Sequence, residues 1–503
     1  MSGYRACFQR LGMGIAITAI GMPATAQIAQ APAVPQTAPV VPPPVQPTQT
    51  IPAPVAIPAP VVLPQLSEAQ HAQLADLIAK NAVTQGLRER ARPAQVDLDN
   101  DGLVRAALDH ARAVHSGRLD QADFLKVWGI RPQPYDPLPA FAAAVRSDTL
   151  ANWIRTLGPP WAGYDALVAG LDHYRTIAAN GGWQTLASGP DLTLNATGAR
   201  VIALRKRLAI EDKAVSVTGD RFDQALLDAV RRAQRRYGLN PSGIVSTQTL
   251  AMLNAPVEAR IRQIMANMER WRWLPSTLEQ NRIQVNIAAA VLTLFDGDNP
   301  VMSMKAVTGR PGDETPMLVS QIHSIVLNPP WNVPTSIATR ELWPKERANP
   351  GYLRRAGFRV IDNGDGSKRL QQSSEKSALG RFKFDFPNEF AVYLHDTPAQ
   401  AGFAKFDRLA SHGCVRLEKP EALATRLLAT NPEWQVPEIK ATVAGGKTVR
   451  AQMADSVAVY LLYWTAFANP DGTVSFRDDP YSWDGVLADK IEARSAAQAV
   501  AAR

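Results

Sequence analysis

The spacing of apolar residues predicts a helical first part of the chain. From residue 66 to about 183, apolar side chains recur every three to four positions, which is the period of an amphipathic helix. Ser67 stands where an N-cap residue is expected, and Glu68 follows it in the first turn. We therefore expect a helical scaffold domain over residues 66–190.

Residues 191–256 keep the helical period but form a shorter unit. Three stretches each place apolar residues on one face: 201–208, 222–230 and 246–254. Ser246 is expected to cap the third stretch, and Pro256 ends it. A connecting helix is predicted within residues 257–281.

The apolar period changes from 3.6 to 2 near residue 282, which indicates strands. A charged segment rich in Trp, Tyr and Arg, residues 332–378, interrupts the strands and contains a predicted hairpin turn over 362–366. The predicted strands cover residues 282–287, 291–295, 301–308, 322–327, 381–385, 390–395, 457–463 and 473–476.

Together these patterns predict a multidomain α+β protein. A helical scaffold and a three-helix module precede a mostly β domain over residues 282–485, which carries the insert 332–378. Residues 486–503 are predicted to form a C-terminal helix or tail. The chain of 503 residues is long enough for several domains of this size.

The N-terminal segment differs from the rest in composition. Arg5 and Arg10 form a positive segment before a short apolar stretch, residues 11–22. An Ala-Thr-Ala sequence then offers a cleavage site, and together these features predict a signal peptide over residues 1–26. We expect export to the periplasm; the alternative is an uncleaved N-terminal anchor. Residues 27–65 are rich in proline and predict an extended spacer.

The net charge of the sequence is +8, which suits a polyanionic partner such as peptidoglycan with its stem carboxylates. Nucleic acid is not expected as a partner, because no run of basic residues is interleaved with aromatic ones. Charge by itself does not choose a function.

The cysteine content is informative once export is assumed. Cys7 lies in the predicted signal peptide, so the mature chain keeps Cys414 alone. Cysteines in oxidising compartments are normally paired. A lone thiol there is either buried and inert or kept for its reactivity, and the surrounding sequence has to decide.

The residues around Cys414 favour reactivity. His395 lies nineteen positions earlier, at the end of the predicted strand 390–395, where alternation places Tyr393 on the same face. A thiol of ordinary pKa, about 8.5, is only a few per cent ionised at neutral pH, and an imidazole can take its proton. His412 is a rival for this role of base.

Three further residues of the same segment fit acyl transfer. Gly413 permits a backbone conformation that aims N–H groups at one point, and such groups stabilise an oxyanion. Arg416 suits a substrate carboxylate or braces the loop, and these two readings remain open. Ser411 is expected to bond within the loop rather than to act as a nucleophile.

The segment HDTPAQAGFAKFDRLASHGCVR (395–416) resembles the signature of the L,D-transpeptidase catalytic domain, a histidine followed at fixed spacing by Ser/Thr-His-Gly-Cys-x-Arg. The run ALLDAVRRAQRRYGLNPSGIVSTQTLAML resembles the peptidoglycan-binding type 1 domain. Over roughly residues 66–485 the chain resembles the large multidomain L,D-transpeptidases of Gram-negative bacteria. Further segments that carry the likeness are NMERWRWLP, TGRPGDETP, NPPWNVPTSIATRELWPK, NPGYL, ALGRFKFDFPN and FRDDPYSWD.

The resemblance implies a role for each of these residues. Cys414 is the nucleophile, His395 its general base, and Tyr393 borders the site. Gly413 and Cys414 provide oxyanion-hole amides, and His412 orients the loop. The insert 332–378 is a lid. Trp331 and Tyr352 either help to line it or only pack within the fold, and both readings remain open.

The resemblance also implies the reaction. Cys414 attacks the carbonyl of diaminopimelate in a tetrapeptide stem, D-alanine leaves, and the amine of a neighbouring stem resolves the thioester into a 3→3 cross-link. No metal or cofactor is required, carbapenems are expected to acylate the same thiol, and association with other wall-synthesis enzymes is a further expectation.

Several alternatives remain beside this reading. An L,D-carboxypeptidase or an enzyme that anchors lipoproteins to the wall needs the same site, and a non-catalytic wall-binding protein needs only residues 191–256. His323 has no comparable surroundings and is expected to be an ordinary strand histidine. The acidic stretch from Asp97 resembles a calcium loop but has Leu108 where a bidentate acid is required, so no calcium site is expected.

Overall fold

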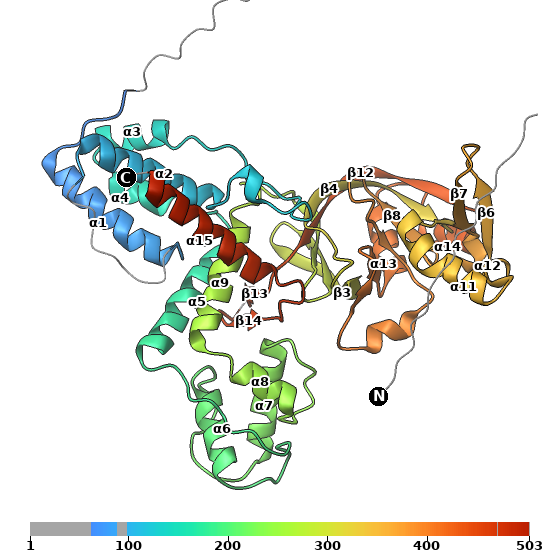
Figure 1. Cartoon of the computed structure of the whole chain (residues 1–503), viewed down its shortest axis with the longest axis horizontal. Helices are drawn as coiled ribbons and strands as arrows, with labels where there is room; N and C mark the ends of the chain where they lie inside the picture. Colours follow the sequence, from blue (N-terminus) through green and yellow to red (C-terminus); the bar gives the residue numbers. More distant parts are fainter. Residues whose placement is uncertain (1–61, 88–97, 470, 502–503) are drawn as a thin grey trace, which may run out of the picture. The chain divides into compact units, whose positions relative to one another are not determined.

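The computed structural model describes residues 62–87, 98–469 and 471–501 (Figure 1). The predicted signal peptide, Cys7 and all but the end of the proline-rich segment lie outside the described residues. No helix within the described ranges combines the length and apolar character needed to cross a membrane.

The scaffold part is helical, as predicted. Ser67 begins α1 with a capping box, in which its side chain accepts the N–H of Gln70 and the Gln70 side chain reaches back. Asp99, from the acidic stretch, caps α2 by accepting the N–H of Gly102. The helices are α1 (Glu68–Thr84), α2 (Asn100–Ser116), α3 (Leu138–Arg146), α4 (Leu150–Arg155) and α5 (Ala162–Ala179).

The three-helix module packs around one apolar centre. Leu204, Phe222 and Val230 are fully buried within it. Ser246 caps the third helix by accepting the N–H of Thr249. The helices are α6 (Ala199–Ala209), α7 (Gln224–Arg236) and α8 (Thr247–Leu253), and the connecting helix α9 (Val257–Trp271) follows.

The β domain, which was predicted over residues 282–485, is built on a sheet that closes on itself, since β2 pairs with both β1 and β3. Its strand order is β10-β3-β11-β9-β8-β4-β12-β1-β2. The prediction of a mostly β domain is therefore confirmed. The strands are β1 (Asn281–Asn286), β2 (Val291–Asp296), β3 (Asn299–Gly309), β4 (Leu318–Leu327), β8 (Phe382–Asp385), β9 (Leu394–His395), β10 (Leu409–Ser411), β11 (Val415–Leu417) and β12 (Val449–Leu462).

The predicted strand 390–395 is wrong for most of its length, because only Leu394 and His395 pair. The side chain of Asn388 accepts the N–H groups of Phe390 and Val392 and donates to the Val392 carbonyl. These bonds fold the segment into a turn, in which Ala391 takes a φ of +54°. A side chain that satisfies local backbone groups competes in this way with strand pairing.

The insert forms a small unit of its own between β4 and β8, which pair directly with each other. Its hairpin turn lies where the sequence predicts it, and Val333, Ile337, Leu342, Leu353 and Leu370 are buried in a separate apolar cluster. Figure 1 shows its helices gathered beside the β6–β7 hairpin. The elements are β5 (Trp331–Asn332), α10 (Thr335–Ile337), the π-helix η2 (Ala338–Leu342), α11 (Trp343–Ala348), α12 (Tyr352–Arg355), β6 (Phe358–Asp362) and β7 (Lys368–Gln372).

The last part of the chain connects the sheet to the helical domains. A two-stranded ribbon follows β12, and its Phe476 ring stacks on Tyr237 of the three-helix module, with 5.9 Å between ring centroids. The elements between β11 and the end are α13 (Pro420–Leu428), α14 (Val436–Ala444), β13 (Ala466–Ala468), β14 (Val474–Phe476) and α15 (Trp483–Ala501).

Candidate active site

The pairing of β9 with β11 gathers the candidate residues on one face of the sheet. These strands run parallel, with Val415 opposite Leu394 and Arg416 opposite His395. Leu394 and Val415 are fully buried on the core side. Because side chains alternate along a strand, His395 and Arg416 lie on the other face.

Cys414 and Tyr393 precede these pairs and lie together. The backbone N–H and the hydroxyl of Tyr393 both hydrogen-bond the Cys414 sulfur. The cysteine is half-buried, and burial raises the pKa of its thiol. The hydrogen bonds from Tyr393 and the positive charges of Lys383 and Arg416 have the opposite effect and lower this pKa.

Tyr393 is held by contacts on several sides. The Lys383 ammonium lies 4.3 Å from its ring centroid, and the Trp331 side chain hydrogen-bonds its hydroxyl. Burial, followed by the charge of the cysteine, raises the pKa of Tyr393 well above its ordinary range. The hydroxyl therefore keeps its proton, which it can donate to the sulfur.

His395 is buried, with 5% of its surface exposed. Its Nδ1 hydrogen-bonds the carbonyl oxygen of Asp396, and a carbonyl only accepts, so Nδ1 carries the proton and Nε2 is left as the acceptor. Burial, and then the charge of Arg416, lower the pKa of His395 to about 3. The ring is therefore neutral, and its Nε2 is free to accept a hydrogen bond, although in this structure no hydrogen bond joins it to Cys414.

The loop from Ser411 to Cys414 is closed by its own hydrogen bonds. The Ser411 hydroxyl donates to the Cys414 carbonyl over 2.5 Å and accepts the Gly413 N–H over 3.1 Å. Gly413 has a φ of +110°, a conformation that favours glycine. The expectation that both amides face an oxyanion needs correction here, because the Gly413 N–H is occupied. The Cys414 N–H has no partner among the described residues.

His412 contacts the insert instead of the thiol. Its Nε2 lies 2.6 Å from Oε1 of Glu341, which belongs to η2 in the insert. This hydrogen bond is the largest of the effects that lower the pKa of Glu341. Nearby, Asp313 pairs with Arg340 of the insert at 2.7 Å and with Arg310 at 2.8 Å.

The guanidinium of Arg416 has no hydrogen bond or ion pair within the part of the chain that the structure describes, whereas its backbone pairs with β3 and β9. Arg416 is half-buried, and burial lowers the pKa of its guanidinium while the neighbouring Cys414 raises it. A cation without a protein partner beside the thiol is available for a ligand anion.

Two other candidates lie elsewhere. Tyr352 packs against the apolar cluster of the insert, and no described contact connects it with Cys414, Tyr393 or His395. His323 is exposed on β4. Within the described ranges, no three His, Cys, Asp or Glu side chains gather as metal ligands would.

Two residues of the site were not singled out from the sequence. Thr315 donates its hydroxyl proton to the Gly413 carbonyl over 2.7 Å, and Tyr481 bonds the Gly309 carbonyl over 2.6 Å and the Thr315 N–H over 3.3 Å. The segments TGRPGDETP and FRDDPYSWD, which contain them, were noticed only for their resemblance. Their closeness to Cys414 requires long-range pairing.

Comparison with protein families assigns the domains. Residues 280–448 match the family described as "L,D-transpeptidase catalytic domain". Residues 197–253 match a family described as "Putative peptidoglycan binding domain", and residues 65–171 match one described as "Scaffold domain". The chain therefore carries a catalytic domain of the L,D-transpeptidase family, with a peptidoglycan-binding type 1 domain before it.

A curated relative agrees with this assignment. A Haemophilus influenzae protein named "Putative L,D-transpeptidase" is 31% identical over 244 residues, which are 45% of this chain and 49% of the relative. The match thus spans about half the length of each protein.

Among solved structures, an L,D-transpeptidase from Xylanimonas cellulosilytica is 15% identical, with a TM-score of 0.18 and coverage of 55% of this chain and 99% of that one. One from Stackebrandtia nassauensis is 12% identical, with a TM-score of 0.23 and coverage of 55% and 97%. L,D-transpeptidase 3 from Mycobacterium tuberculosis, in complex with a faropenem-derived adduct, is 18% identical, with a TM-score of 0.19 and coverage of 36% and 60%. These scores are too low to add to the assignment.

Proposed function

We propose that this protein is a cysteine acyltransferase that forms 3→3 cross-links between peptidoglycan stem peptides. The observation that carries the proposal is the position of Cys414, which receives two hydrogen bonds from Tyr393 on the face that also bears a neutral His395 and an unpaired Arg416. The family of the domain supports the same chemistry.

The first half-reaction forms a thioester. Nε2 of His395 takes the thiol proton, and the Cys414 sulfur attacks the carbonyl of diaminopimelate in a tetrapeptide stem. The oxyanion that forms is stabilised by the free N–H of Cys414. Collapse of this intermediate breaks the bond to D-alanine, whose amine leaves with the proton held by His395.

The second half-reaction transfers the acyl group. The side-chain amine of diaminopimelate on another stem attacks the thioester, and the bond to the Cys414 sulfur breaks. His395 accepts the proton of the amine and passes it to the sulfur, which restores the thiol. The thioester retains the energy of the cleaved amide bond, so the transfer to the second amine needs no external energy source. Arg416 binds a stem carboxylate in this scheme; its guanidinium has no protein partner within the described residues, which favours a substrate role over that of a brace.

The insert acts as a lid. Glu341 of the insert hydrogen-bonds His412, the residue that precedes Gly413 and Cys414 in the chain. Arg340 of the insert forms an ion pair with Asp313. A closed lid excludes water and favours the amine as acceptor. Trp331, at the start of the insert, borders the site through Tyr393.

The remaining expectations belong to the same proposal. Export by the predicted signal peptide places the protein in the periplasm, and the three-helix module holds it on peptidoglycan. Carbapenems acylate Cys414, because their strained amide carbonyl presents the same electrophile. We also expect this protein to associate with other enzymes of wall synthesis.

The test is incubation of the protein with disaccharide-tetrapeptide, followed by mass spectrometry, with Cys414→Ala as control. We expect dimers that have lost one D-alanine. Tripeptide alone identifies a carboxypeptidase, and transfer only to a lipoprotein-derived amine identifies an anchoring enzyme. Unchanged turnover by the Cys414→Ala protein refutes the proposal.

A further inference from the structure

A buried hydroxyl holds the peptide unit that leads into Cys414. Thr315 is fully buried, and its Oγ1 lies 2.7 Å from the Gly413 carbonyl oxygen and 2.8 Å from the Gly309 nitrogen. The Gly309 N–H can only donate, so the single proton of the Thr315 hydroxyl goes to the Gly413 oxygen. Both hydrogen bonds therefore have a fixed direction.

This contact also sets the direction of the Cys414 N–H. The Gly413 carbonyl and the Cys414 N–H belong to one planar trans peptide, in which they point in opposite directions. Gly413 has a φ of +110°, and glycine leaves its backbone wide freedom. The bonds of Ser411 hold the groups on either side of this peptide unit, and Thr315 bonds the Gly413 carbonyl of the unit itself.

The Cys414 N–H is the loop donor that this contact leaves for an oxyanion. The neighbouring Gly413 N–H is occupied by Ser411 over 3.1 Å, whereas the Cys414 N–H has no acceptor within the described ranges. A donor that is oriented before the reaction stabilises the charge that develops on the attacked carbonyl.

Tyr481 in turn holds Thr315. Its hydroxyl donates to the Gly309 carbonyl over 2.6 Å and accepts the Thr315 N–H over 3.3 Å. One phenol thus closes both ends of the loop 309–315, and it is itself buried, with 8% of its surface exposed. Removal of this hydroxyl leaves two buried backbone groups without their partner.

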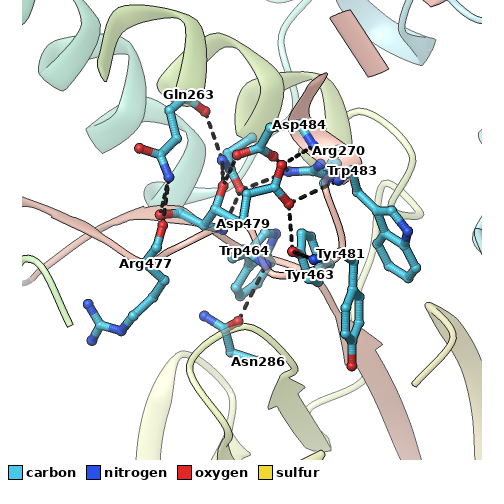
Figure 2. A network of polar contacts seen from close by, with 12 residues as sticks. Gln263, Arg270, Asn286, Tyr463, Trp464, Arg477, Asp479, Tyr481, Trp483 and Asp484 are labelled. Atoms are coloured by element: carbon cyan, nitrogen blue, oxygen red, sulfur yellow. Dashed lines mark hydrogen bonds and ion pairs between the residues drawn. The ribbon is translucent and has the colours of Figure 1, made fainter. Parts of the chain in front are cut away.

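Figure 2 shows what fixes Tyr481, whose ring extends away from a network of polar contacts. Its N–H donates to the Tyr463 hydroxyl over 3.2 Å, and that hydroxyl donates to Asp479 over 2.6 Å. Asp479 also accepts the N–H of Asp484, which pairs with the buried Arg270 of α9 at 2.6 Å. The segment 477–485 is therefore anchored on the connecting helix.

We propose that Thr315 and Tyr481 are positioning residues for acyl transfer, which aim the Cys414 N–H at the oxyanion through the Gly413–Cys414 peptide unit. The inference rests on the proposed function, in which Cys414 is the nucleophile. Neither side chain touches the reacting atoms.

The test compares two reactions of the same thiol in the purified full chain. Release of D-alanine from disaccharide-tetrapeptide passes through an oxyanion, whereas alkylation of Cys414 by iodoacetamide does not. Thr315→Val keeps the shape and removes the hydroxyl, Thr315→Ser keeps the hydroxyl, and Tyr481→Phe removes the second anchor.

We expect Thr315→Val to lower kcat for D-alanine release about 100-fold, the loss typical of one oxyanion donor, with KM and the alkylation rate within about twofold of the wild type. Thr315→Ser restores kcat to within about fivefold, and Tyr481→Phe lowers it about tenfold, because the loop keeps its other bonds.

Wild-type release by Thr315→Val overturns the inference, and so does an equal fall of release and alkylation, since this indicates a general structural defect. Where circular dichroism shows that Thr315→Val is unfolded, Tyr481→Phe decides by the same two criteria. No release by a wild-type protein whose thiol alkylates normally overturns the proposed function itself, which separates the two failures.

Discussion

The ionisation state of Cys414 leads to a prediction that separates two kinds of cysteine enzyme. Burial raises the pKa of the thiol, and burial lowers the pKa of His395 to about 3. The resting site therefore holds a neutral thiol and a neutral imidazole, not a thiolate–imidazolium pair. In such a site, alkylation follows the small fraction of thiolate at each pH.

The magnitude follows from the pKa values. An ordinary thiol, with a pKa of about 8.5, is about 3% ionised at pH 7. Because its pKa is raised, the Cys414 thiol should be ionised to a smaller fraction than this at the same pH. The alkylation rate should rise about tenfold per pH unit from pH 6 to 8, without a shoulder near the ordinary pKa of histidine, about 6.5. The assay is the rate of carboxamidomethylation of Cys414 by iodoacetamide, followed by mass spectrometry.

Tyr393→Phe serves as the internal control. The Tyr393 hydroxyl donates to the sulfur and lowers the pKa of the thiol. A hydrogen bond to a charged group contributes about 1.5–3 kcal/mol, or about one to two pKa units, so the variant should be alkylated at least tenfold more slowly at pH 7.5. A flat rate between pH 5.5 and 7.5 would refute the neutral pair, and faster alkylation of Tyr393→Phe would refute the role of its hydroxyl.

Three further predictions concern neighbouring residues. The folded-state pKa of His395 is lowered to about 3, so below about pH 6.5 the unfolded chain binds a proton that the folded chain does not, and the free energy of unfolding falls as the pH drops toward 3. At pH 4.5 the loss in the free energy of unfolding amounts to about 2.7 kcal/mol. Urea titration should find this loss missing in His395→Gln but present in His323→Gln. Glu341→Gln weakens the contact of the lid with His412, and we expect the ratio of tripeptide to cross-linked dimer to rise severalfold in the mass-spectrometric assay; an unchanged ratio contradicts the lid role. Arg416→Gln should raise KM for the tetrapeptide about tenfold or more at unchanged thermal stability, whereas a fall in melting temperature with unchanged KM identifies Arg416 as a brace.

Local sequence was sufficient where local chemistry decides the structure. Ser67 and Ser246 cap the helices for which the sequence predicted them, because a cap requires only a side-chain oxygen and an N–H three residues away. The change of apolar period near residue 282 located the β domain, because the period of apolar residues is also a local property of the sequence. The error at residues 390–395 came from one side chain, since Asn388 bonds backbone groups that a strand would have paired.

The candidate site was only partly accessible from the sequence. The spacing of His395, Gly413 and Cys414 identified the thiol, because these residues lie within one short segment. Nothing in that segment indicated that Ser411 would occupy the Gly413 amide. The geometry of a loop with a φ of +110° at Gly413 decides which N–H groups remain free.

The sequence by itself determined the change from helices to strands near residue 282, the candidate thiol Cys414 and the family that the catalytic domain resembles. Only the tertiary structure decided which groups surround that thiol. Glu341 reaches His412 across 71 positions, and Thr315 reaches Gly413 across 98. Such contacts depend on strand register and on the burial of distant segments together, and neither is encoded in the spacing of residues along one stretch of chain. The pKa values of Cys414 and His395 have the same origin, since burial, which dominates both, exists only in the folded sheet.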